Sequence, residues 1–159
     1  MDPASMDPEI LVDADACPVK DECYKVAARH GLKVFLVANR LFQAPRHPMI
    51  ERVLVPQGPD VADDWIAERA DGRKIVVTAD IPLAARCVKA GAWVLAPNGK
   101  IFDDASIGMA LAMRDLMADL RSGGAITGGP GGFSPRDRSA FLSALELCVQ
   151  RTRRRTTRP

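Results

Sequence analysis

The sequence predicts an α/β fold: a three-layer α/β/α sandwich with a mainly parallel central sheet, plus C-terminal helices. Short apolar runs rich in Val, Ile and Leu recur along the chain, and such runs are typical of strands buried on both faces of a parallel sheet. Amphipathic segments with helical spacing separate these runs, as expected when helices cover a parallel sheet. Polar residues follow several of the runs directly, and in open α/β sheets this is the edge where ligands bind.

The first strand is expected over residues 10–13, where an apolar run ends in two carboxylates. Pro18 is suited to open the helix that follows, because a missing N–H costs nothing there, and Gly31 is suited to end it. A loop containing two prolines is expected over 41–49, and a tight turn over 97–100. Further strands are expected over 34–38, 52–55, 74–78 and 92–95, and further helices over 60–70, 82–91, 103–120 and 134–150.

The 159 residues suit one domain over residues 10–150, with a flexible leader over 1–9 and a basic flexible tail over 151–159. The formal charge is +2, but five arginines lie in the last nine residues, so the remaining 17 basic and 20 acidic residues give −3. No segment approaches the roughly 20 apolar residues of a membrane span, and no signal pattern is present. We therefore expect a cytoplasmic protein without a membrane partner.

Carboxylates recur at three places that a parallel sheet would bring together. Asp13 and Asp15 follow the first strand, Asp80 follows the strand over 74–78, and Asp60 and Asp63 lie in the first turn of a helix. Each has a simpler interpretation, because an Asp at such a place often only caps a helix or complements its dipole. Their coincidence favours a shared site, although Asp64 could face it in place of Asp63.

Several carboxylates in one place repel each other unless a cation lies between them. Oxygen-rich sites suit Mg²⁺ or Mn²⁺ rather than zinc, and these ions activate water and hold a phosphodiester for in-line attack. The four cysteines are scattered without a Cys-x-x-Cys pair, so they predict small buried thiols and not a zinc site or disulfides.

Cations and polar residues near these strand ends are candidates for binding an anionic substrate. Arg136 and Arg138 lie in the first turn of the last helix, where the helix dipole disfavours cations, which indicates an anionic ligand or a buried acidic partner. The glycine-rich stretch over 122–132 matches neither a Walker motif nor Gly-x-Gly-x-x-Gly. The methionines of the helix over 103–120 are expected to pack in the core. The predicted substrate-binding residues are Lys20, Asn39, Thr78, Arg136 and Arg138.

Seven motifs, spread over nearly the whole chain, resemble the YaiI/YqxD family of bacterial proteins, whose function is unsettled. They are Val-Asp-Ala-Asp-Ala-Cys-Pro-Val-Lys (12–20), Leu-Val-Ala-Asn (36–39), Gly-Pro-Asp-Val-Ala-Asp (58–63), Val-Thr-Ala-Asp-Ile-Pro-Leu-Ala (77–84), Met-Arg-Asp (113–115), Thr-Gly-Gly-Pro (127–130) and Arg-Asp-Arg-Ser-Ala-Phe (136–141).

That family is in turn similar to PIN-like and NYN nucleases, which carry an Asp after the first strand, an acid on a helix and a hydrophobic–Thr/Ser–x–Asp strand end. Asp13, Asp63 and Asp80 match these positions, with Asp15 and Asp60 as neighbours. The resemblance implies a PIN-like fold and a Mg²⁺- or Mn²⁺-dependent nuclease acting on RNA. It implies Asp13, Asp63 and Asp80 as catalytic residues and all five carboxylates as metal ligands.

Two alternatives stay open. A haloacid-dehalogenase-like phosphatase would use Asp13 as nucleophile and Asp15 as acid, but its lysine and its late Gly-Asp pair are not evident. A catalytically inactive RNA-binding module would keep the fold without the chemistry. Five carboxylates at a ligand edge argue against a simple anion binder without a cation.

Overall fold

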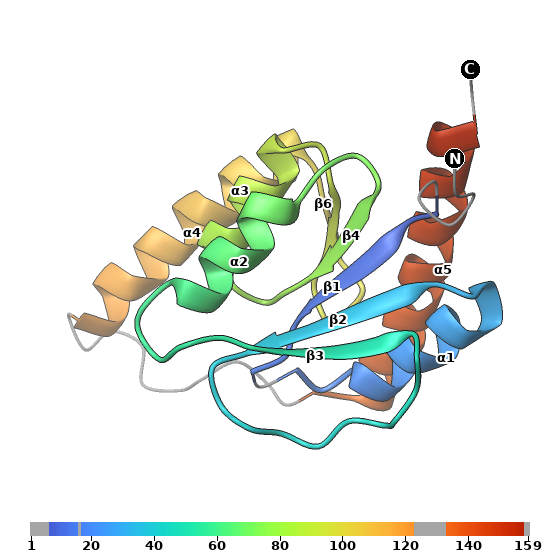
Figure 1. Cartoon of the computed structure of the whole chain (residues 1–159). Coiled ribbons are helices and arrows are strands. Elements are labelled where there is room, and N and C mark those ends of the chain that lie inside the picture. The colour runs from blue at the N-terminus through green and yellow to red at the C-terminus, as the bar shows by residue number, and fades with distance from the viewer. Residues whose placement is uncertain (1–6, 16, 123–132, 158–159) are drawn as a thin grey trace.

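Six strands form one sheet, in the order β3-β2-β1-β4-β5-β6, in the computed structural model, which describes residues 7–15, 17–122 and 133–157 (Figure 1). The strands β1 to β5 are parallel, and β6 runs antiparallel to β5 after the turn predicted over 97–100. The elements are β1 (Glu9–Asp13), α1 (Lys20–His30), β2 (Lys33–Ala38), β3 (Ile50–Leu54), α2 (Val61–Arg69), β4 (Lys74–Val77), α3 (Ile81–Lys89), β5 (Trp93–Leu95), β6 (Ile101–Phe102), α4 (Asp104–Ser122) and α5 (Pro135–Thr157).

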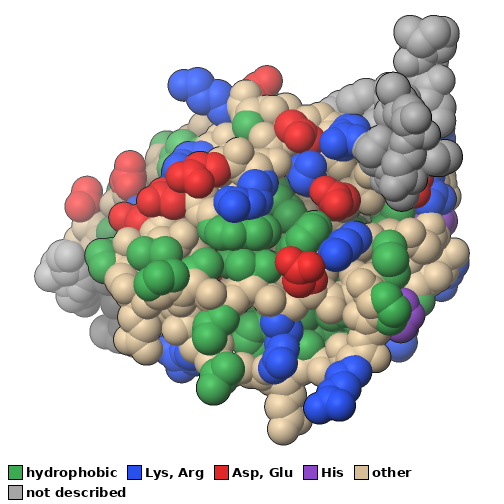
Figure 2. Space-filling view, viewed as in Figure 1, with side chains coloured by type: hydrophobic (Ala, Val, Ile, Leu, Met, Phe, Trp, Pro, Cys, Tyr) green, Lys and Arg blue, Asp and Glu red, His purple; other side chains and the backbone are tan. Residues whose placement is uncertain are grey.

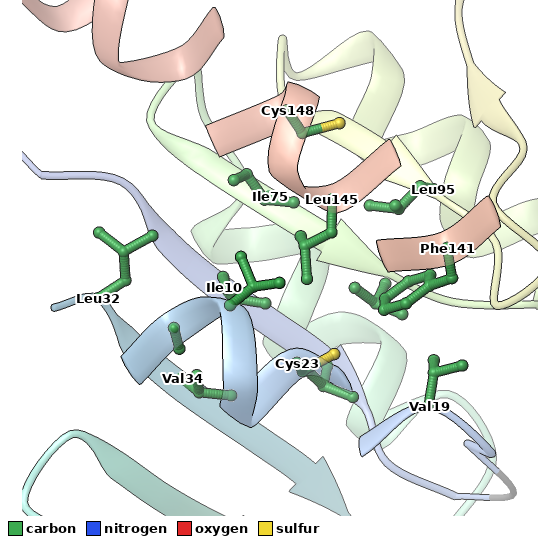
Figure 3. Packing of buried hydrophobic residues seen from close by; sticks show 14 of the residues in the cluster. Ile10, Val19, Cys23, Leu32, Val34, Ile75, Leu95, Phe141, Leu145 and Cys148 are labelled. Carbon is green, nitrogen blue, oxygen red and sulfur yellow. The ribbon is translucent and has the colours of Figure 1, made fainter. Parts of the chain in front are cut away.

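Helices cover both faces of this sheet, so the predicted three-layer α/β/α sandwich is confirmed (Figure 1). One core lies between the sheet and the pair α1 and α5, where Phe141 and Leu145 of α5 pack against Ile10 and Ile75 of the strands (Figure 3). The other core lies under α2, α3 and α4 and includes Leu11 of β1. The long C-terminal helix α5 is therefore a structural part of one layer.

The strand β1 is the centre of the sheet and is buried on both faces. Its residues Ile10, Leu11 and Val12 are no more than 1% exposed, and they alternate between the two cores. Val12 pairs in register with Val77 of β4, so the two strands end side by side. The chain proceeds from β1 to β2 and β3 on one side and resumes with β4 on the other side. The carboxyl end of β1 is thus the point where the strand order reverses, which is where open α/β sheets bind ligands.

Several predicted boundaries differ from the structure by one or two residues: Glu9, predicted in the leader, begins β1, and the strand expected over 52–55 is Ile50–Leu54. Two differences concern helices. The helix α1 begins at Lys20, and Pro18 lies in the turn before it, while Gly31 ends the helix in the left-handed conformation as predicted. The helix α5 continues to Thr157, so residues 151–157, predicted as part of a flexible tail, are helical. Thr152 is buried, so this turn lies against the core, and its hydroxyl donates to the Cys148 carbonyl oxygen one turn earlier in the same helix (2.6 Å). Residues 1–6 of the predicted leader and 158–159 of the tail lie outside the described residues.

The predicted packing role of the methionines in α4 is wrong for two of them. Met109 is 74% exposed and Met113 is 52% exposed, whereas Ile107 is buried against α3 and its neighbours. The physical reason is that α4 packs against α3 and β6 at the end of the sheet, which leaves another part of its surface uncovered. The prediction of buried thiols is confirmed for Cys23, Cys87 and Cys148, whereas Cys17 is only partly buried.

A hydrophobic area with charged side chains around it lies beside α2 (Figure 2). A hollow in the surface is lined by Phe35 and Trp65, whose ring centroids are 5.9 Å apart, and the Arg69 guanidinium lies 3.8 Å from the Trp65 ring. Glu9 and Lys74 also line this hollow, so it lies near the amino ends of β1 and β4, away from the predicted site. In the described part of the chain, no helix combines the length and the apolar character needed to cross a membrane.

The turn between β5 and β6 packs against α5 through Gly99, and we expect this contact to tolerate no side chain. Gly99 has φ +92°, and a Cβ there would lie 2.7 Å from the Ala140 carbonyl carbon. Gly31 has φ +66°, and a Cβ added there would have nothing within 4 Å. Gly31→Ala is therefore a control that measures backbone strain alone. Urea denaturation should show a loss of about 1 kcal/mol for Gly31→Ala and of about 3 kcal/mol or more for Gly99→Ala. Equal losses would contradict the close packing at Gly99.

Candidate metal and phosphate site

The hydroxyl of Thr78 joins the carboxyl ends of β1 and β4. It donates to Asp13 Oδ2 (2.9 Å) and accepts from the backbone N–H of Asp80 (3.0 Å). Thr78 itself is only 2% exposed, so it has little surface left for the substrate contact that the sequence predicted. Its position makes it the residue that orients the two acids, one on each strand end.

The carboxylate of Asp80 also has a structural role. Its Oδ1 accepts from the backbone N–H of Leu83 (3.0 Å), and this bond caps the amino end of α3. Among the described residues, no hydrogen bond is made to Oδ2 of the same carboxylate. Capping and ligand binding are therefore compatible here, because one oxygen serves each purpose.

The structure distinguishes Asp63 from Asp64, which the sequence did not. Asp64 is exposed and accepts from the Arg86 guanidinium of α3 (2.8 Å). Asp63 is half-buried, and its pKa is raised by burial and by the charges of Asp80 and Asp60. Asp63 therefore faces the other acids, while Asp64 is held away from them by an ion pair.

All five predicted carboxylates interact electrostatically. Asp13 shows this most clearly, because its pKa is raised from 3.8 to about 6. The main cause is burial; the Thr78 hydrogen bond opposes it, and the charges of Asp63, Asp15 and Asp80 add to it. Asp60 joins the group through its effect on Asp63. The edge of the sheet thus carries an excess of negative charge that a cation would relieve.

Asp60 does not show the simpler behaviour of a helix-capping side chain. It precedes α2, but its side chain makes no capping hydrogen bond. Its φ is +66°, and it is the one residue other than glycine with positive φ in the described part of the chain. A left-handed Asp is uncommon and often marks a constrained site.

The donor chemistry of this edge fits a hard divalent cation, since every candidate ligand is a carboxylate. As the side chains are placed, no three Asp, Glu, His or Cys residues among those described form a group that could hold a metal ion. Mg²⁺ commonly binds through only one or two carboxylates and completes its shell with water and substrate phosphate oxygens. The residue types thus suit Mg²⁺ or Mn²⁺; Asp13 and Asp63 are the half-buried acids of the group, and Asp15, Asp60 and Asp80 are exposed.

Two of the three predicted substrate-binding cations, Arg138 and Lys20, have partners within the protein. Arg138 donates to the Pro18 carbonyl oxygen (2.9 Å) and lies 3.3 Å from Oε1 of Glu22, whose side chain is 9% exposed. Of the two explanations that the sequence left open for this arginine, the structure contains the buried acidic partner. Lys20 lies 5.1 Å from the ring of Phe42.

The other predicted binding residues lie at the same end of the sheet or near it. Asn39 is half-buried directly after β2, and Arg136 is exposed in the first turn of α5. The glycine-rich stretch lies outside the described residues, apart from Ser122 at the end of α4. None of these residues is hydrogen-bonded to the acids in the described structure.

Two residues that the sequence reasoning missed affect the site. Arg86 positions Asp64 and lowers the pKa of Asp63 through its charge, and Glu22 fixes the arginine of α5. The sequence around Arg86 or Glu22 could not have predicted these contacts, because each partner lies 22 or more residues away in the sequence.

Comparisons with known proteins agree on one family. A family model described as "Uncharacterized BCR, YaiI/YqxD family" matches residues 11–151. A UPF0178 protein of Rhodopseudomonas palustris strain BisB5 is 65% identical over 150 residues, which cover 94% of this chain and 92% of the relative. A UPF0178 protein of strain BisB18 is 67% identical over 145 residues, covering 91% and 94%. A UPF0178 protein of Azorhizobium caulinodans is 66% identical over 145 residues, or 91% of each chain.

Burial of Asp13 gives a testable pH dependence of stability in the metal-free protein. The folded state keeps this proton up to about pH 6, whereas the unfolded chain loses it near pH 4, so stability should fall as pH rises between these values. The loss should be at most about 3 kcal/mol. Asp13→Asn removes the charge and retains an acceptor for Thr78, so in EDTA its Tm should exceed that of the wild type at pH 7.5.

Near pH 4 the two proteins should unfold at more similar temperatures, because the folded state then keeps the proton of Asp13 and the unfolded chain has lost only part of it. A difference in Tm that is the same at pH 4 and at pH 7.5 would contradict a buried, strained carboxylate at this position.

Proposed function

This chain belongs to the YaiI/YqxD family, and from the acidic edge of its sheet we propose that it is a Mg²⁺- or Mn²⁺-dependent nuclease that hydrolyses phosphodiester bonds, preferably in RNA. The observation that carries the proposal is the coupling of Asp13, Asp63 and Asp80 at the strand-order reversal, with the pKa of Asp13 raised to about 6. Carboxylates that raise one another's pKa are found mainly at functional sites.

Asp13, Asp63 and Asp80 would hold the metal, with Asp15 and Asp60 beside them. A divalent cation bound there would activate water and balance the charge of the phosphodiester. Asp63 is half-buried and makes no hydrogen bond with the described residues, so its carboxylate could accept a proton from the attacking water. Thr78 would keep Asp13 and Asp80 in fixed positions.

Two helix amino ends support a phosphate-bearing substrate. The helices α1 and α3 begin directly after β1 and β4, so their dipoles favour negative charge at this edge. The amino end of α1 has no side-chain cap, because Val19 occupies the cap position. Its first N–H groups would be suited to a phosphate, with Lys20, Arg136, Asn39 and Arg138 near enough in the fold to be tested as further contacts.

The phosphatase alternative and the inactive RNA-binding module predict different substrates, so one assay separates all three. Wild-type protein would be incubated with single-stranded RNA, DNA or a phosphomonoester, in Mn²⁺, Mg²⁺ or EDTA. We expect cleavage of RNA that requires the metal. Monoester turnover alone would favour the phosphatase, and RNA binding without any metal-dependent cleavage would favour the binding module.

The pair Asp63 and Asp64 provides a matched control for the nuclease assay. Asp63→Asn should lower the rate of RNA cleavage by about 100-fold or more, because the metal-binding acids supply several kcal/mol to the transition state. Asp64→Asn should change it by less than about 3-fold, since it breaks only an exposed ion pair with Arg86. Equal losses in the two variants would contradict the assignment of Asp63 to the site.

A further inference from the structure

A groove of about 800 Å³ lies next to the acidic edge and has no role in the chemistry described so far. It is lined by the ends of β4 and β5, by β6, and by residues of α4 and of the start of α5. Ala79 is part of its lining and stands between Thr78 and Asp80 in the sequence. The groove therefore lies beside the site at the carboxyl edge of the sheet, although none of the five acids is part of its lining.

The wall formed by α4 is apolar and uncovered. Met109, Met113 and Met117 lie one turn apart along the helix and line the groove, with Phe102 and Phe133 from other elements. Met109 and Met113 are among the most exposed large hydrophobic residues that the structure describes. Methionine side chains are flexible and polarisable, and they favour contact with flat aromatic surfaces.

Cations and polar groups accompany these apolar side chains. Lys100 and Arg114 line the same groove, and Asn98 accepts a hydrogen bond from the Lys100 N–H (3.0 Å). Asp137 is the single acid in the lining, and its Oδ2 accepts from the backbone N–H of Ser134 (3.0 Å). The groove thus combines an apolar wall with the positive charges of Lys100 and Arg114, of which Arg114 lies 3.8 Å from Oδ1 of Asp115.

This combination fits one kind of occupant. A nucleotide presents a flat apolar base and a negative phosphate, and single-stranded nucleic acid is bound by surfaces that offer apolar stacking partners together with cations. In a duplex the bases are stacked inside and could not reach the methionines. An apolar peptide would not require Lys100 and Arg114, and a phosphate alone would not require the methionines.

We propose that this groove holds unstacked bases of single-stranded RNA beside the scissile phosphate, and that it selects single strands over duplexes. The inference rests on the proposed nuclease function in one respect: that function is what places the RNA strand against Asp13 and Asp80. Base binding itself needs no metal and no hydrolysis, so it can be measured independently. Met113 and Met109 are binding residues in this assignment, and Lys100 and Arg114 bind the backbone.

The test measures binding by fluorescence anisotropy in EDTA, with a labelled single-stranded oligouridylate, an abasic oligonucleotide of equal length and charge, and an RNA duplex. Wild-type protein should bind the oligouridylate about 10-fold more tightly than the abasic strand. It should bind the duplex more weakly than the oligouridylate. Met113→Glu should remove this preference, and Met113→Leu should retain it.

Leu116→Glu is the matched control, because Leu116 lies on the same helix, is 50% exposed against 52% for Met113, and is outside the lining of the groove. It adds the same charge and should keep the preference for bases. Equal loss in both glutamate variants, or no effect of Met113→Glu, would overturn the proposal.

Light scattering and thermal unfolding of the same variants identify other occupants. A change from dimer to monomer in Met113→Glu would assign the groove to a second copy of the chain. A fall in Tm with unchanged binding would assign it to the chain's own segment 123–132. Either result would overturn the proposal.

The outcome is distinguishable from that of the nuclease proposal. Base-dependent binding that requires Met113, in a protein that never cleaves RNA with Mn²⁺ or Mg²⁺, would support the groove and refute the nuclease. Metal-dependent cleavage, together with RNA binding that Met113→Glu leaves unchanged, would support the nuclease proposal and refute the proposed role of the groove.

Discussion

The hydrogen bonds of the Thr78 hydroxyl connect the two strands on which the site depends. Because β1 and β4 are adjacent, parallel and in register, Asp13 and Thr78 end at the same level of the sheet. The same hydroxyl accepts from the Asp80 N–H at the start of α3. Thr78 is only 2% exposed, and an unpaired buried hydroxyl or N–H raises the free energy of the folded state. Both hydrogen bonds of its hydroxyl are therefore needed to keep this geometry. The fold thereby fixes the distance between its two central acids.

The same arrangement concentrates negative charge where burial already disfavours it. Burial and the neighbouring carboxylates raise the pKa of Asp13, and a similar combination raises that of Asp63. The charge of Arg86 lowers the pKa of Asp63, but its guanidinium is paired with the exposed Asp64, and the pKa of Asp63 stays raised. Proteins commonly keep such strain at functional sites, where stability is reduced in favour of binding or catalysis.

Much of the fold could be predicted from the sequence, because β1 and β4 are continuous apolar runs and glycine and proline mark the helix ends. Gly31 ends α1 as expected, and the acids at the strand ends meet because parallel strands share an edge. The limits are equally physical. Whether Asp63 or Asp64 faces the site depends on a contact with Arg86 from another helix, and the extent of α5 depends on burial of Thr152. The exposure of Met113 could not be read from its helical spacing, because spacing does not show which faces of a helix other elements cover.

The most direct measurement is the titration of the Asp13 side-chain carboxyl by carbon-13 NMR, with and without Mg²⁺. In EDTA the midpoint should lie at about pH 6, as burial and the neighbouring acids require. A cation bound between the acids favours the charged form, so Mg²⁺ should lower the midpoint to below about 4. A midpoint that stays near pH 6 in saturating Mg²⁺ would contradict a metal site at this edge of the sheet.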